Sequence, residues 1–456
     1  MLIIVSDIHL GDGTCGKSIS ASAFRLFANR LQELAFNASW RQDGKYRPIE
    51  EVNILLLGDI LDPLHSTRWL EKGLGEPGYV RPWTDSHASE FSTMLLTITR
   101  NILKKNTEAV DFLKGLSGKD GLTLPPATRS GKPDMESSQR EPVSVHLYYM
   151  IGNHDWYYHL TGPAFDTIRE EIAQAFGLSN PPGPFPHDLN ESASLKYLLD
   201  EHKVYARHGD IYDPFNFNMA NSRDSATLGD AFVVEIVNRF PIEVEHRVKD
   251  DLQPGILENL HELSNVRPTL ATPMWIGSQL RQNNVNQVVQ QKIKDLWNEV
   301  FDEFLAIPFV KRENKPYQLD IIDGLELAIH LTDRLSFTTI DEIFFWARKL
   351  LKSDEITYAH HALKEKAFLD RNAQYIVYGH THHYEIVPLD SFQAASRLTN
   401  QIYMNSGTWH TYFDLATYKP EEKKFVPYQV LTYLTFYKDD ERGGTSFETW
   451  SGTISD

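Results

Sequence analysis

The polar residues best suited to chemistry occur in short groups, most of them at the ends of apolar runs. In chain order the groups are Asp7-Ile8-His9, Gly58-Asp59, Gly152-Asn153-His154-Asp155, His208-Gly209-Asp210 and Gly379-His380-Thr381-His382. Imidazole, carboxylate and amide oxygen ligands together suit zinc, iron or manganese. Two such ions about 3.5–4 Å apart can activate a bridging hydroxide and neutralise the charge of a phosphoryl group. The joint pattern therefore predicts a two-metal centre that hydrolyses phosphoesters.

The spacing within two of these groups places both side chains on one side of the backbone. Asp7 and His9 are two positions apart, as are His380 and His382. Side chains at i and i+2 of an extended strand share a face, so each pair can reach one ion. Either pair alone is weak evidence, because such spacings occur by chance in many sequences. The alternative interpretation is that these residues are caps or turn formers at strand ends.

The apolar runs next to these groups predict an α/β core. Residues 2–6 and 52–57 are apolar except for Ser6 and Asn53, and residues 21–36 carry apolar side chains at helical spacing. This order predicts a β-α-β unit whose parallel strands are buried on both faces. Ligands of such sheets bind beyond the carboxyl ends of the strands. Asp7, His9 and Asp59 would lie at that edge.

The rest of the chain predicts a core that is interrupted by a helical region. Before the interruption, helices are expected at residues 90–116 and 163–176, a long polar loop up to residue 142, and strands at 143–151 and 203–207. Helical spacing then occurs at residues 230–240, 287–305, 319–331 and 339–351. Strand patterns return at residues 374–378, 384–389, 401–404 and 426–437. We therefore expect a catalytic core at 1–213 and 370–456, with an all-helical insertion at 214–369 acting as a cap.

The motif set resembles one family of enzymes. Asp7-x-His9, Gly58-Asp59-x-x-Asp62, Gly152-Asn153-His154-Asp155, His208-Gly209 and Gly379-His380-x-His382 are similar to the motifs of the calcineurin-like metallophosphoesterases. The resemblance covers roughly residues 1–213 and 370–437. It implies a four-layer sandwich of two mixed β-sheets flanked by helices, with the dinuclear metal centre at the strand ends.

The resemblance also implies a role for each motif residue. One ion would bind Asp7, His9 and His382, the other would bind Asn153, His208 and His380, and Asp59 would bridge the two. His154 would assist the leaving group without binding a metal, and Asp62 would orient His154. Asp210 and His410 are candidates for substrate contact. Two divalent or mixed-valence ions of Mn, Fe or Zn are expected, with a phosphodiester, phosphomonoester or pyrophosphate substrate.

Several branches and alternatives stay open. Ser6-Asp7-Ile8-His9-Leu10-Gly11 and His208-Gly209-Asp210 are similar to the bacterial pyrophosphohydrolases that cleave UDP-diacylglucosamine, but the chain is longer and lacks an obvious basic amphipathic helix. The protein Ser/Thr phosphatases have an arginine where Pro63 stands. A nuclease of the DNA-repair exonuclease type would need a local run of Lys and Arg flanking the pocket. The nearest candidates are interspersed with acidic residues and are Lys203, Arg207, Arg223, Arg239, Arg247 and Lys249. The last alternative is a partner-binding module with a vestigial metal site.

Composition narrows these choices. The chain has 456 residues, a formal net charge of -17 and a pI near 5.5, which disfavours a broad nucleic-acid track. Metal ions can still hold a small or medium phosphorylated substrate. Cys15 is the single cysteine, so no internal disulfide forms. We found neither a leader-like start nor an apolar run near the roughly 18 residues of a membrane helix. A cytoplasmic location is the expectation.

Overall fold

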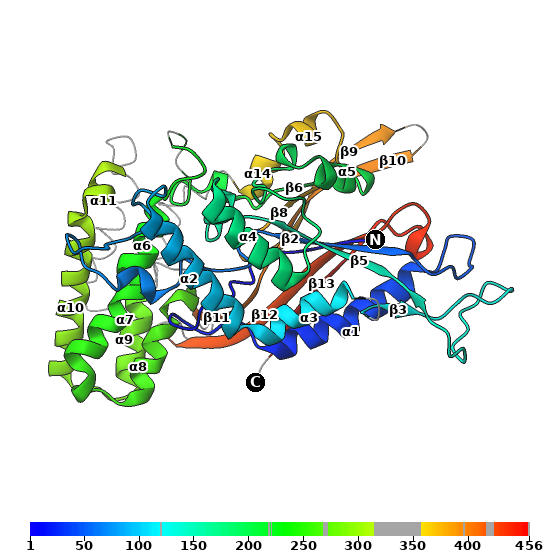
Figure 1. Ribbon diagram of the computed structural model, residues 1–456. Helices are drawn as coiled ribbons and strands as arrows, with labels where there is room; N and C mark the ends of the chain where they lie inside the picture. The colour runs from blue at the N-terminus through cyan, green and yellow to red at the C-terminus, as the bar shows by residue number, and fades with distance from the viewer. Residues whose placement is uncertain are drawn as a thin grey trace.

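The computed structural model describes residues 1–118, 121–217, 219, 221–267, 272–313, 357–394, 397–415 and 424–454. Within these ranges the protein is mixed α/β, with two principal mixed β-sheets and helices around them (Figure 1). The helices predicted at 319–331 and 339–351 lie outside the described residues. In the described part of the chain, no helix has both the length and the apolar character needed to cross a bilayer.

The larger sheet contains the predicted β-α-β unit. Its strand order is β5-β2-β1-β12-β11-β7, and β13 pairs with β12. These strands are β1 (Leu2–Val5), β2 (Glu51–Leu57), β5 (Ser144–Met150), β7 (Val266–Arg267), β11 (Trp409–Leu415), β12 (Phe425–Phe436) and β13 (Phe447–Ile454). Helix α1 (Ala21–Ala38) connects β1 to β2, which run parallel to each other and to β5. The carboxyl ends of these three strands therefore meet at one edge.

The smaller sheet delivers the other two motifs. It has the order β6-β8-β10-β9 and consists of β6 (Val204–Ala206), β8 (Tyr375–Tyr378), β9 (Tyr384–Ala394) and β10 (Arg397–Ser406). Strands β6, β8 and β10 are parallel, whereas β9 is antiparallel to β10. The strands predicted before His208 and His380 are thus confirmed. The structure shows in addition that they are parallel neighbours, and both residues follow carboxyl ends.

Alternate side chains along each strand pack into different layers of the hydrophobic core. In β1, Leu2 and Ile4 pack into the core shared with Val377 and Met404 of the smaller sheet. Ile3 and Val5 instead join the core on the helical side of the larger sheet, because successive side chains of a strand point to opposite faces. Helices α2 (Ser89–Lys105), α3 (Thr107–Leu116) and α4 (Pro163–Phe176) pack there with α1. Helix α5 (Ala193–Glu201) packs beside β6, and α14 (Tyr358–Ala362) and α15 (Lys366–Leu369) cover the far face of the smaller sheet (Figure 1).

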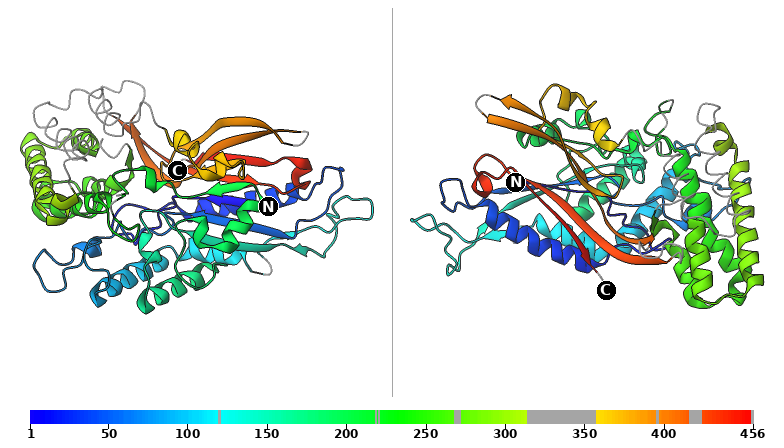
Figure 2. Two further views of the ribbon diagram at one scale, coloured as in Figure 1. Left: turned by 90° about the horizontal axis from the view of Figure 1, so that it is seen from above. Right: turned by 180° about the vertical axis from the view of Figure 1, so that it is seen from behind.

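Helices form most of the described part of the region between β6 and β8. Besides α14 and α15, one group of helices lies in this region. It contains α6 (Leu228–Phe232), which continues through a π-helical turn (Val233–Asn238) into α7 (Arg239–Val248), and α8 (Pro254–Leu260), α9 (Thr272–Gln282), α10 (Gln287–Ala306) and α11 (Pro308–Glu313). The helices predicted at 230–240 and 287–305 are confirmed. The group lies at one end of the two sheets in all views (Figure 2). It packs against the core, as the 5.6 Å distance between the ring centroids of Trp275 and Phe413 shows.

The structure corrects several sequence predictions. The insertion at 214–369 is not all helical, because Val266 and Arg267 form β7 and pair with Phe413 and Asp414 at the edge of β11. An edge strand offers unpaired backbone groups, and a two-residue strand is too short to produce a periodic pattern. The helix predicted at 90–116 is interrupted at Asn106. The polar loop before residue 142 contains a short ladder of β3 (Thr123–Leu124) and β4 (Glu141–Pro142).

The histidine at the carboxyl end of α5 predicts an acid-sensitive fold. Burial lowers the pKa of His202 to about 3, and its Nδ1 donates to the carbonyl of Leu198 at 2.9 Å. An unfolded histidine titrates near pH 6.5, so protons bind preferentially to the unfolded chain below that pH. Between pH 7.5 and pH 5, this protonation should lower the unfolding free energy of the wild type by about 2 kcal/mol. Glutamine does not titrate, so the His202→Gln variant should not show this loss. Urea denaturation at both pH values measures this difference, and equal losses would contradict the prediction.

Candidate metal centre

The backbone at the predicted ligands departs from ordinary strand geometry. Five of these residues have a positive φ: Asp7 (53°), His9 (50°), Asp59 (54°), His380 (66°) and His382 (62°). Each non-glycine residue in this left-handed region costs about 1–3 kcal/mol. The surrounding structure must impose these conformations, and such strain is concentrated at functional sites.

One set of predicted ligands converges beside the end of β1. The Nε2 atoms of His9 and His382 lie 3.1 Å apart. Asp7 Oδ1 lies 3.2 Å from His382 Nε2 and 3.9 Å from His9 Nε2. Tetrahedral ligands at the usual zinc distances are separated by about 3.3 Å. The three atoms are therefore spaced as ligands of one ion.

The second set converges beside the ends of β5, β6 and β8. Asn153 Oδ1 lies 3.2 Å from His208 Nε2 and 2.9 Å from His380 Nδ1. Asp59 Oδ2 lies 3.2 Å from His208 Nε2 and 3.8 Å from His9 Nε2 of the first set. Asp59 thus faces both sets, as its predicted bridging position requires. The structure brings all seven predicted metal ligands together. However, His380 and His382 fall in different sets, so the spacing prediction that this pair reaches one ion is wrong. Both residues have a positive φ and therefore leave the extended conformation in which side chains at i and i+2 share a face.

Hydrogen bonding around His208 leaves several buried acceptor atoms of the cluster facing one another. His208 Nδ1 lies 3.0 Å from the carbonyl oxygen of Leu57, which can only accept, so Nδ1 carries a proton. In the neutral imidazole, Nε2 is then a bare lone pair that faces oxygens of Asp59 and Asn153. Asp7 Oδ1 is buried and has no hydrogen-bond partner among the described residues. Buried acceptors without donors are costly, and bound cations would satisfy them.

Burial and neighbouring charges shift the pKa values of the carboxylates in the cluster and of His208. Burial raises the pKa of Asp7. Burial also opposes the charged forms of Asp59 and His208, but their mutual attraction is stronger. It holds the pKa of Asp59 well below, and that of His208 well above, the ordinary value. Without metal ions, imidazolium must supply the positive charge, so the site favours cations.

Close approach explains two of the motif glycines. A Cβ atom at Gly152 would overlap Asp59 Oδ1 and the imidazole of His208. A Cβ atom at Gly379 would lie 2.7 Å from Asp7 Oδ2. The absence of a side chain therefore lets the loops carry the ligands to within metal-binding distance of one another.

Asp155 fixes the central loop rather than joining the ligands. Its Oδ1 accepts from the backbone N–H of Gly152 at 2.6 Å, and its Oδ2 accepts from the N–H of Ile60 at 3.1 Å and from the hydroxyl of Tyr149 at 2.6 Å. Burial, followed by the nearby charge of Asp59, raises the pKa of Asp155 to about 7. The side chain joins the loops after β2 and β5.

His154 lies beside the two ligand sets and is held by carboxylates. Its backbone N–H donates to Asp59 Oδ1 at 2.8 Å, and its Nδ1 lies 3.1 Å from both oxygens of Asp62. Burial lowers the pKa of His154, but the charges of Asp62 and Asp59 outweigh this effect and raise it to about 9. The imidazole is therefore a protonated group at neutral pH in the metal-free chain.

Asp62 has more partners than predicted. Its Oδ2 also accepts from Nδ1 of His9 at 2.8 Å and from Nδ1 of His65 at 2.7 Å. His9, Asp62, His65 and His154 lie close enough to hold an ion. However, all three imidazoles turn Nδ1 toward the carboxylate, so Asp62 orients them. Sequence analysis missed His65, for which the only signal is its position three residues after Asp62.

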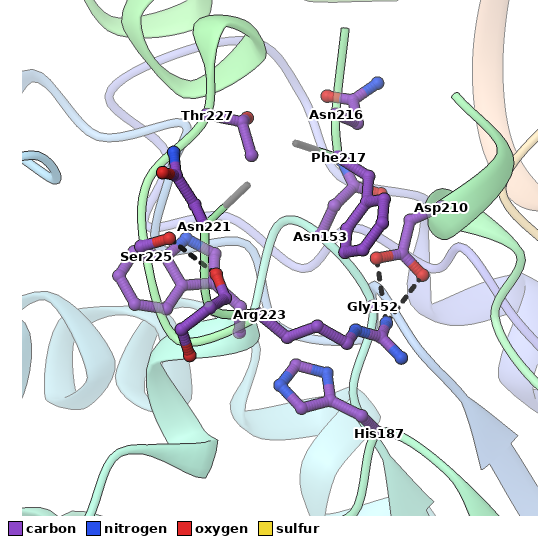
Figure 3. Close-up of a pocket in the computed structure, with 12 residues that line it drawn as sticks. Gly152, Asn153, His187, Asp210, Asn216, Phe217, Asn221, Arg223, Ser225 and Thr227 are labelled. Carbon is purple, nitrogen blue, oxygen red and sulfur yellow. Dashed lines mark hydrogen bonds and ion pairs between the residues drawn. The ribbon is translucent and has the colours of Figure 1, made fainter. Parts of the chain in front are cut away.

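The two predicted substrate contacts lie in separate pockets beside the ligands. Asp210 shares a pocket with Asn153 and Arg223, and Arg223 donates to both oxygens of Asp210 at 2.8 Å (Figure 3). His410 shares the other pocket with His154, and its Nε2 lies 2.5 Å from Asn265 Oδ1. Contact of Asp210 and His410 with substrate stays a prediction.

Asp213 is a polar partner of the site that lies outside the predicted ligand set. Its Oδ2 lies 3.1 Å from His380 Nε2, on the opposite side of the ring from Asn153. A carboxylate on the second nitrogen of a metal-binding imidazole fixes the ring orientation and raises its basicity. Asp213 is therefore placed to support His380.

No protein-family model matches this chain, and no curated protein matches it either. The fold and the site by themselves define a mixed α/β protein with buried histidine and aspartate groups that could hold metal ions.

Proposed function

We propose that this protein is a metal-dependent phosphoester hydrolase of the calcineurin-like metallophosphoesterase type. The observation that carries the proposal is the position of Asp59, whose Oδ2 faces His208 of one ligand set and His9 of the other. The layered arrangement of two mixed sheets with helices on both outer sides supports the sandwich that this family implies.

In the proposed reaction, one set of residues binds the metal ions and another transfers a proton. A pair of bound ions would lower the pKa of a shared water and neutralise charge on the phosphoryl oxygens. Asp7, His9 and His382 would hold one ion, Asn153, His208 and His380 would hold the other, and Asp59 would join them. Asp62 holds Nδ1 of His154, so Nε2 is the atom left to give a proton to the leaving-group oxygen. Asp62 is the positioning residue for His154.

Ion pairing weighs against the nuclease alternative. Arg207 is paired with Asp188 at 2.6 Å, Arg223 with Asp210 at 2.8 Å and Lys249 with Glu245 at 3.1 Å. Arg239 and Arg247 are paired with glutamates. Among the described residues, five of the six candidate cations, all except Lys203, therefore have carboxylate partners, whereas a nucleic-acid track needs charge that is available to phosphates.

Metal removal tests the proposed function directly. Exhaustive chelation is expected to abolish hydrolysis of bis-p-nitrophenyl phosphate, and added Mn²⁺ or Zn²⁺ should restore it, because the proposed nucleophile and charge neutralisation both depend on the ions. The panel should include phosphomonoesters, nucleotides and pyrophosphate-linked sugars. A fully metal-loaded protein without activity on any of these substrates would contradict the proposal and favour a binding module.

A further inference from the structure

A second group of potential metal ligands lies outside the proposed dinuclear centre. It consists of His159, His187 and Asp224, whose ligand atoms all lie within 4.8 Å of one another. His159 ends the short helix η2 (Trp156–His159), and His187 precedes the short helix η3 (Leu189–Glu191). Asp224 lies in the segment that leads into α6. Three separate segments therefore converge at this point.

The separations agree with coordination of one ion. Asp224 Oδ1 lies 3.4 Å from His187 Nε2 and 3.9 Å from His159 Nε2, and the ring centroids of the two histidines are 4.5 Å apart. Tetrahedral ligands at usual zinc distances are about 3.3 Å apart. Only small side-chain movements are needed to bring the three atoms to coordination distance.

Hydrogen bonding orients His159 as a ligand. Its Nδ1 donates to the carbonyl oxygen of Phe185 at 2.8 Å, which leaves the lone pair of Nε2 on the side of Asp224. A carbonyl on the second nitrogen is the usual support of a metal-binding imidazole. The segment that carries His187 is held as well, because its backbone N–H donates to Glu191 Oε2 at 2.7 Å.

Direct hydrogen bonds account poorly for the same arrangement. Asp224 Oδ1 forms one long hydrogen bond of 3.4 Å with His187 Nε2, and its 3.9 Å distance from His159 Nε2 exceeds hydrogen-bond length. His187 is only 3% exposed, and its Nε2 is the ring nitrogen that faces Asp224. Arg223 lies beside His187 in the pocket, but its guanidinium is bound to both oxygens of Asp210 (Figure 3). The positive charge of Arg223 is thereby offset by Asp210.

We propose that His159, His187 and Asp224 form a mononuclear site for a divalent transition metal, with Zn²⁺ the best match to two imidazoles and one carboxylate. The carboxylate of Asp224 is 38% exposed, so solvent can complete the coordination. The ion would tie the segment leading into α6 to the core loops that follow the central Gly152–Asp155 motif. The proposed mononuclear site shares no residue with either ligand set of the dinuclear centre.

Metal stoichiometry provides the first test. After incubation with Zn²⁺ and gel filtration, the Asp224→Asn and His187→Gln variants should each hold one equivalent less than the wild type. Asp200→Asn is the matched control, because Asp200 is an exposed aspartate paired with Lys196. The comparison counts a difference, so it holds whether or not the dinuclear centre hydrolyses phosphoesters. Variants that retain the zinc content of the wild type would overturn the proposal.

Cobalt spectroscopy provides a second test that does not depend on loss of a ligand. In the Asp224→Cys variant, added Co²⁺ should produce a thiolate-to-cobalt charge-transfer band, and the exposure of Asp224 makes this substitution compatible with folding. The wild type controls for Cys15. The band should disappear when His187→Gln is added to the same chain. A spectrum of Asp224→Cys identical to that of the wild type would overturn the proposal.

Discussion

Replacing Asp59 with alanine is expected to reduce hydrolysis of bis-p-nitrophenyl phosphate on the order of 10³-fold or more and to lower metal content at both ligand sets. Asp59 is the ligand predicted to bridge the sets, with Oδ2 3.2 Å from His208 Nε2 and 3.8 Å from His9 Nε2. Its Oδ1 also accepts from the backbone N–H of His154. Removal of this carboxylate therefore affects both ions and the central loop together.

The measurement combines initial rates with metal equivalents per chain. Asp111→Ala is the matched control, because Asp111 lies exposed on α3, and it should leave both quantities unchanged. The metal-free Asp59→Ala chain is expected to fold, because the substitution removes a buried carboxylate close to Asp7. Wild-type activity in a folded Asp59→Ala variant would rule out the proposed bridging role.

The two neighbours in the central motif should respond differently to substitution. His154→Ala is expected to retain both metal ions but to lower kcat by about 10²–10⁴-fold, the usual contribution of a general acid or base. Asn153→Ala should instead weaken metal binding, because Asn153 Oδ1 contacts His208 and His380 of the second ligand set. Metal titration followed by saturation kinetics separates these outcomes.

His65 provides the control for the separate roles of Asn153 and His154. His65 is also bound to Asp62 through Nδ1, so His65→Ala removes an imidazole from the same carboxylate without changing the predicted proton donor. We expect a smaller loss of kcat for His65→Ala than for His154→Ala, and partial rescue of His154→Ala by added imidazole. If His154→Ala empties a metal site, the assignment of separate roles to Asn153 and His154 is wrong.

Local sequence patterns were enough to predict the elements that carry the candidate site. The apolar runs before Asp7, Asp59 and Asn153 became three parallel strands of one sheet, and the runs before His208 and His380 became parallel neighbours in the other. These predictions succeeded because periodic burial is a local property of the chain. Parallel strands present their carboxyl ends at one edge, so proximity of the motifs followed from topology.

Very short strands and contacts between residues far apart in the sequence produced no periodic pattern from which they could be predicted. Strand β7 is two residues long and depends on the open edge of β11. His65 and Asp213 acquired their positions beside Asp62 and His380 only when separate loops packed together. The group formed by His159, His187 and Asp224 depends on three such loops.

The sequence by itself thus determined which residues could serve as ligands and which strands would deliver them. Tertiary structure alone decided that Asp62 contacts three imidazoles and that His159 and His187 lie beside Asp224. It also set the distances at which Asp59, the predicted bridging residue, faces both ligand sets. The physical reason is that ligand type and strand periodicity are encoded within a few neighbouring residues. Distances of 3–4 Å between side chains from different loops depend on the packing of the whole core.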